Sequence, residues 1–163
     1  MKLKKFAALM MAGLVMGYSL TACEDDDEDD PISAKVAGTY SGTVTATVMG
    51  QAIGSNEGLT VTIEQASHNT VNVTLPAFSY SGRGKTETIP ALKIEGCNVT
   101  GGVGAYLVSK DTCELTAKNG DSDMNFKVTT LAGGFWDGEM KSFIYDVRPG
   151  SMPMNIHFSF DEK

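Results

Sequence analysis

The sequence has little of what most enzymes and nucleic-acid-binding proteins require. Its two histidines, His68 and His157, lack the spacing of a His-x-x-x-His or His-Glu-x-x-His site, and no Cys-x-x-Cys pair is present, so a metal site is not expected. There is no Gly-x-Ser-x-Gly elbow, and the glycines at 101, 102 and 104 lack the strand-to-helix context of a phosphate loop. No basic patch is available for nucleic acid. We therefore expect a protein without catalytic residues, metal or cofactor.

Long hydrophobic runs are also missing, because the one extended apolar segment, residues 6–18, is shorter than the roughly 20 residues of a transmembrane helix. Three lysines, Lys2, Lys4 and Lys5, precede it. A basic start, a short apolar run and small residues at the end are typical of a secretory signal, whereas a buried core helix has no use for a basic start. We expect residues 1–22 to be a signal peptide.

The segment Leu20-Thr21-Ala22-Cys23 closes this signal and resembles the lipobox of bacterial lipoproteins. The resemblance implies cleavage before Cys23, a diacylglycerol thioether on its sulfur and acylation of the new amine by a fatty acid such as palmitate. Two or more acyl chains hold a protein firmly on a membrane, whereas one acyl chain anchors it only marginally. The alternative is a signal that is cut elsewhere beside an incidental Cys23.

Seven acidic residues follow Cys23 without interruption, at positions 24–30, and Pro31 ends the run. Such a block repels itself and cannot bury apolar surface, so we expect residues 23–35 to be a tether. A run of this kind after a lipidated cysteine resembles a signal for the outer face of the outer membrane in some anaerobic Gram-negative bacteria. The resemblance implies an outer-membrane protein that faces the cell exterior. A calcium-binding tail is the weaker alternative, since the run has no fixed loop geometry.

The remaining chain, about 130 residues, is enough for one domain with a real core. The formal net charge of −7 becomes −10 without the three signal lysines, and seven of these negative charges lie in residues 24–30. The domain itself therefore carries only about −3. We expect it to be monomeric.

Cys97 and Cys113 remain as an even pair once Cys23 is lipidated, and an exported domain favours a disulfide. If strands at 91–99 and 112–118 pair directly, the two side chains could face each other. If residues 103–108 form a strand between them, the cysteines lie about 9.6 Å apart, which is too far to bond. Both a bridge and two buried thiols remain open.

From Val36 onward the alternation of apolar and polar residues predicts strands. We expect a turn at residues 50–56, a bulge at Gly96, and a turn at Gly133-Gly134 before a strand at 135–147. Eight to ten strands spaced by about ten residues predict an all-β fold, an antiparallel up-and-down barrel. The closing strand near Met154 should pair with the first strand. The expected strands cover residues 40–48, 59–64, 71–75, 78–80, 92–99, 113–117, 124–128, 135–147 and 154–160.

The first strand, within Val36-Ala37-Gly38-Thr39-Tyr40-Ser41-Gly42-Thr43-Val44, is similar to the opening of the calycin-like β-barrel domain of bacterial lipoproteins. The resemblance covers residues 36–160 and implies a lipocalin-like barrel at the cell surface, without an established ligand. Lipocalins carry Gly-x-Trp on this strand, where Gly38-Thr39-Tyr40 stands here.

Tyr40, Phe135 and Trp136 are candidate ligand-lining residues, because aromatic side chains at a barrel mouth can form small-ligand pockets. The alternative is that Phe135 or Trp136 fills the core. We expect a non-catalytic binding protein for a small apolar ligand, a glycan or a protein partner. A second hypothesis is haem capture, with His157, His68 or a methionine as axial ligand.

Overall fold

The computed structural model describes residues 30–82 and 84–163, so the predicted signal and Cys23 lie outside the described residues. A short 3-10 helix, η2 (Ile32–Lys35), precedes the strands. The strands are β1 (Gly38–Val48), β2 (Gln51–Gln65), β3 (Thr70–Leu75), β4 (Phe78–Gly82), β5 (Lys85–Ile89), β6 (Leu92–Gly102), β7 (Ala105–Lys110), β8 (Cys113–Asn119), β9 (Ser122–Trp136), β10 (Glu139–Pro149) and β11 (Ile156–Glu162).

Eight strands close into an antiparallel barrel in the order β1-β2-β3-β6-β7-β9-β10-β11, and β11 returns to β1. The closing strand pairs Phe160 with Val44 and Phe158 with Ala46, so the predicted pairing of the last strand with the first is confirmed. Closure leaves no exposed edge within the ring. The all-β barrel predicted from the alternation of residues is confirmed.

β8 lies outside the ring and continues the line of β7 along β9. The pairs Lys110–Leu131 and Cys113–Val128 belong to one uninterrupted register. β6 turns away at this point, through a bulge at Gly96 that the sequence predicted. The Lys110 ammonium donates to the carbonyls of Glu95 and Gly96, at 2.9 and 3.1 Å, where β6 and β8 separate. The lysine thus binds two backbone carbonyls of β6 that lie beyond the residues paired with β7.

Two predicted turns are wrong. Gly133 and Gly134 lie inside β9, and the chain turns at Asp137-Gly138. A Cβ at Gly133 would lie 2.5 Å from Cδ2 of Phe143, so this glycine makes room for a core ring rather than for a turn. The turn predicted at residues 50–56 is similarly shorter, because β2 starts at Gln51 and extends the pairing with β1.

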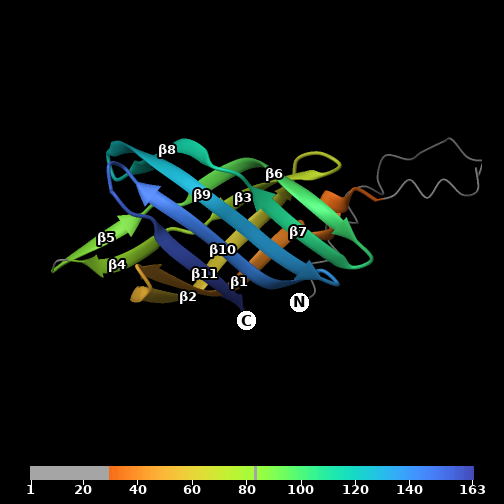
Figure 1. Ribbon diagram of the computed structural model, residues 1–163, viewed down its shortest axis with the longest axis horizontal. Coiled ribbons are helices and arrows are strands. Elements are labelled where there is room, and N and C mark those ends of the chain that lie inside the picture. Colours follow the sequence, from red (N-terminus) through yellow and green to blue (C-terminus); the bar gives the residue numbers. More distant parts are fainter. Residues whose placement is uncertain (1–29, 83) are drawn as a thin grey trace, which may run out of the picture. The chain divides into compact units, whose positions relative to one another are not determined.

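The barrel has two distinct ends (Figure 1). The entry end carries η2, the start of β1 and the β2–β3, β6–β7 and β9–β10 turns. The far end carries the β1–β2, β8–β9 and β10–β11 turns and the β4–β5 hairpin, which is a separate two-stranded sheet. No helix within residues 30–82 and 84–163 is long and apolar enough to cross a bilayer.

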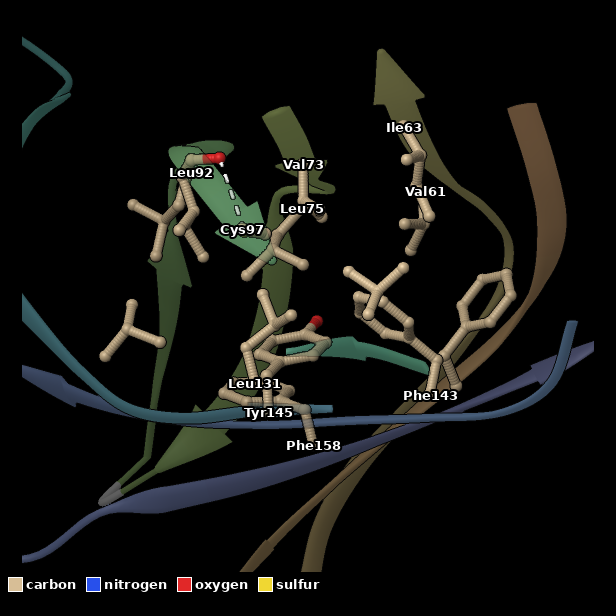
Figure 2. Packing of buried hydrophobic residues seen from close by; sticks show 14 of the residues in the cluster. Val61, Ile63, Val73, Leu75, Leu92, Cys97, Leu131, Phe143, Tyr145 and Phe158 are labelled. Carbon is tan, nitrogen blue, oxygen red and sulfur yellow. Dashed lines mark hydrogen bonds between the residues drawn. The ribbon is translucent and has the colours of Figure 1, made fainter. Parts of the chain in front are cut away.

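Aromatic side chains fill the barrel interior. Tyr145 stacks on Phe158 with ring centroids 4.7 Å apart, and Phe158 meets Phe78 edge to face at 5.3 Å. Figure 2 shows Tyr145 beside Leu131, with its hydroxyl directed into the interior. This hydroxyl is buried and has no hydrogen-bond partner among the described residues. Burial raises the pKa of Tyr145, since ionisation would place a charge in an apolar core.

Candidate binding surfaces at the two ends of the barrel

The entry end is closed by η2 and by two of the predicted ligand-lining residues. Tyr40 donates its hydroxyl to the carbonyl of Val36 at 2.8 Å. Its ring packs against Phe135 with centroids 5.5 Å apart, and both side chains are buried. Burial, with a smaller contribution from Glu162, raises the pKa of Tyr40 to about 12. Tyr40 and Phe135 therefore fill the core at this end, which is the alternative that the sequence left open for Phe135.

Trp136 follows Phe135 on β9 and points to the opposite face, with 52% of its side chain exposed. It borders a shallow groove of about 390 Å³ on the outer wall, floored by Gly134 and Ala105 and flanked by Leu107 and Thr100. Lys141, at the rim, forms an ion pair with Glu139, and the hydrogen bond that its ammonium donates to this carboxylate raises the pKa of Lys141. Trp136 thus shares no pocket with Tyr40.

The far end is covered by the β4–β5 hairpin. Phe78 and Ile89, at its base, are buried in the barrel core. Asn119, the last residue of β8, donates its side-chain amide to the carbonyl of Thr88 at 3.1 Å. Asn56 on β2 likewise donates to the carbonyl of Ser79 at 3.0 Å. The hairpin is therefore fixed to the barrel on two sides, and the interior is closed at this end too.

A larger hollow of about 650 Å³ lies at the far end, along β8, β9 and β10 and under the loop after β10. It is more enclosed than the groove at Trp136. Its accessible lining is more polar than apolar. Its lining residues are Glu114, Leu115, Thr116, Asn125, Phe126, Lys127, Arg148, Gly150, Ser151 and Met152.

Two cations give the far-end hollow its charge. Arg148 donates through Nε to Oδ1 of Asn155 at 3.0 Å, and Asn155 in turn donates to Thr129. This chain fixes the orientation of the guanidinium, whose other donors can reach a ligand. Lys127 lies 3.7 Å from a carboxylate oxygen of Glu114, both largely exposed. The pair is weak, so a ligand anion can compete with Glu114 for this lysine.

Cys97 and Cys113 are free thiols. β8 continues the line of β7 along β9 and does not pair with β6, so neither of the two arrangements considered from the sequence is the observed one. Burial raises the pKa of Cys97 to about 11, although Lys110 nearby opposes this. Burial also raises the pKa of Cys113, which is half-buried. Both thiols are thus mainly protonated at neutral pH, and Cys97 is also shielded by its burial.

The two histidines lie at opposite ends of the barrel. His68 is in the β2–β3 turn at the entry end, and His157, at the start of β11, is on the outer wall at the far end. His157 Nδ1 lies 2.6 Å from Oδ1 of Asp146. The two rings cannot bind one haem iron together. In the part of the chain that the structure describes, no cluster of three metal-ligating side chains occurs.

Sequence reasoning missed the far-end hollow and the exposed residues around Trp136. The alternation along the strands places Lys127 and Arg148 on outward positions, but only the pairing of β9 with β10 brings them side by side. Leu107 was missed because its segment reads as a glycine-rich loop followed by a short, ambiguous strand. Both surfaces depend on which strands pair and in which register, and the alternation of residues along each strand does not specify that.

The sequence matches the Calycin-like beta-barrel domain family over residues 36–163. The fold is also similar to that of a crystal structure from Bacteroides fragilis, described as a candidate outer membrane protein, with a TM-score of 0.65 and 23% identity. The similarity covers 82% of this chain but 53% of the other, so the chain spans about half the length of that protein. Among curated proteins, none matches this sequence.

Proposed function

The chain belongs to the Calycin-like beta-barrel domain family, and we propose that it is a lipid-anchored protein of the outer membrane that binds a small ligand at the cell surface without catalysis. The lipobox-like segment at residues 20–23 and the acidic run at residues 24–30 support the anchor and the export. The location given for the similar Bacteroides fragilis protein agrees with this proposal.

The far-end hollow is the proposed binding site, and the fixed guanidinium of Arg148 beside Lys127 is the observation that carries the proposal. Leu115 and Met152, which are only partly buried, offer apolar contact, while Arg148 and Lys127 offer positive charge. The matching ligand is a small molecule with an acidic or carbonyl edge that Arg148 binds and with a side that contacts Leu115 and Met152.

Lipidation is tested first, by replacing Cys23. The Cys23→Ala variant should accumulate as unprocessed precursor or be released from the membrane fraction, because it lacks the sulfur that accepts the lipid. Mass spectrometry of the wild-type protein should find acyl groups on the mature N-terminal cysteine. Normal processing and unchanged membrane fractionation of Cys23→Ala would contradict the anchor.

The ligand is tested on protein purified from its native cell without denaturation. Native mass spectrometry should detect a retained small molecule, which Arg148→Gln should lose because the variant removes the charged donor that holds the acidic edge. The loss should be about tenfold or more in occupancy, since hydrogen bonds to charged groups contribute about 1.5–3 kcal/mol. Lys93→Gln, an exposed lysine that pairs with Glu64 away from the hollow, is the matched control. Equal retention by both variants would contradict the site.

A further inference from the structure

Exposed apolar residues gather at one corner of the entry end. We call Val103, Ala105, Leu107 and Trp136 the hairpin patch, because they lie on the β6–β7 hairpin and on the adjoining end of β9. Val103 is fully exposed, and Leu107 is 45% exposed. Ala105 pairs directly with Trp136, and Leu107 lies two residues further along β7 on the same outer face, with Val103 at the tip of the hairpin. Contiguous apolar surface of this kind marks a site of interaction.

The turn at the tip of the β6–β7 hairpin has an unfavourable residue, valine, at a position with positive φ. Val103 and Gly104 both have positive φ, at 53° and 86°, and form a two-residue connection between β6 and β7. Such turns favour Asn-Gly or Asp-Gly, as at Asp137-Gly138 in the neighbouring turn. A β-branched residue is strained at positive φ. Valine at this tip therefore needs an explanation other than turn formation, and contact with an apolar partner supplies one.

The chain enters the barrel at the same end. The described chain runs through η2, where Ser33 donates its backbone N–H to the carbonyl of His68 in the β2–β3 turn, and β1 starts at Gly38. Only seven residues separate Cys23 from Pro31, and this segment reaches at most about 25–30 Å when fully extended. A lipid on Cys23 would thus hold the entry end close to the bilayer.

We propose that the hairpin patch docks onto the lipid surface beside the anchor and orients the barrel with its far end outward. The inference rests on the lipid anchor of the proposed function. Tryptophan side chains prefer the membrane–water interface. Val103 and Leu107, near Trp136, offer further apolar contact to the lipid. At the rim the positive charge of Lys141 is offset by Glu139, whereas the far-end hollow carries Arg148 in addition to its Lys127–Glu114 pair.

Trp136 is the only tryptophan in the chain, so its fluorescence reports on this patch without background. The lipidated full chain is reconstituted into phosphatidylcholine vesicles, with and without lipids brominated along their acyl chains. We expect Trp136 emission to shift to shorter wavelength and to be quenched by the brominated lipid. An emission spectrum that stays unchanged on reconstitution, without quenching, would overturn the proposal.

Two variants separate docking from simple tethering. Val103→Asn removes the apolar tip and places the favoured residue in the turn, so it should fold and lose much of the quenching. Met49→Ser, at an exposed residue of a similar turn on the far end, should keep the quenching. Equal quenching in both variants would overturn the proposal. So would a blue shift caused by a soluble oligosaccharide without quenching by lipid, which would assign the patch to a different partner.

A failure of the anchor is distinguishable from a failure of the docking. If Cys23 carries no acyl group in the cell, the proposed function fails. The chain from Cys23 can still be coupled through that thiol to a maleimide phospholipid, with Cys113→Ala to remove the other accessible thiol and with Cys97 buried. Quenching in these vesicles would support the docking surface alone, and its absence would overturn it.

Discussion

The two ends of this barrel are closed in different ways and present different chemistry. At the entry end, η2 and the Tyr40–Phe135 pair close the core, and the hairpin patch lies on the adjoining wall. At the far end, the β4–β5 hairpin closes the core through Phe78, and the wall carries a hollow with two cations. The eight-stranded ring is common to both. The difference shows that the ring supplies a scaffold, whereas the turns and the short additions at each end determine what it can contact.

The largest expected effect compares two neighbours on β9 that face opposite ways. Phe135→Ala removes a buried ring that packs on Tyr40, and should lower the free energy of unfolding by about 3–5 kcal/mol. Trp136→Ser removes a half-exposed side chain and should cost about 1 kcal/mol or less. Urea denaturation followed by far-UV circular dichroism measures both. Similar losses in the two variants would show that Trp136 also belongs to the core.

Alkaline pH should destabilise the barrel through groups that folding buries in their neutral form. Burial raises the pKa of Cys97 from 9.0 to about 11 and that of Tyr40 from 10.0 to about 12. At a pH between the ordinary and the raised pKa of each group, the folded state still holds a proton that the unfolded state has lost. The stabilisation is therefore complete below about pH 9 and declines as the pH rises toward 12. Thermal melts across this range measure it, and Tyr40→Phe should flatten the upper part. A melting temperature that is constant from pH 9 to 12 would contradict this interpretation.

The buried hydroxyl of Tyr145 gives a smaller effect of opposite sign. It lies unpaired in the core between the two ends, and an unsatisfied buried group costs about 1–3 kcal/mol. Tyr145→Phe keeps the ring stacked on Phe158 and should raise the free energy of unfolding by about 1 kcal/mol. Chemical denaturation measures this. If Tyr145→Phe were less stable instead, the hydroxyl would have a partner that contributes to the fold.

The smallest effect concerns the two turns with unfavourable residues, one at each end. Val103→Asn should stabilise the domain by about 1 kcal/mol, because the left-handed conformation is costly for valine and tolerated by asparagine. Met49→Asn, at φ 50° in the β1–β2 turn, should have an effect in the same direction but a smaller one, since methionine is not β-branched. Denaturation in the absence of membrane isolates this contribution. A loss of stability in Val103→Asn would mean that the valine side chain supports the fold.

The sequence predicts the barrel well, because inward and outward residues alternate along nearly every strand and the closing strand is amphipathic. It places Gly96 at a bulge correctly, since a lone glycine in a strand suggests one. The prediction is wrong at Gly133-Gly134, where the absence of a side chain at Gly133 makes room for the ring of Phe143 on β10. It also does not assign Trp136 to the outer wall or bring Arg148 to Lys127. Those outcomes depend on register between strands, which is set by packing over the whole ring.

The most direct test of the central claim, that the entry end faces the membrane and the far end faces outward, compares two introduced thiols on intact cells. Val103→Cys and Met49→Cys are each made with Cys113→Ala. Both positions are almost fully exposed in the domain itself, at 100% and 86%, so any difference in reactivity must come from the surroundings. A membrane-impermeant maleimide should label Met49→Cys rapidly, and label Val103→Cys only after detergent releases the protein. Equal labelling of the two before detergent would contradict the proposed orientation, and no labelling of either would contradict surface display.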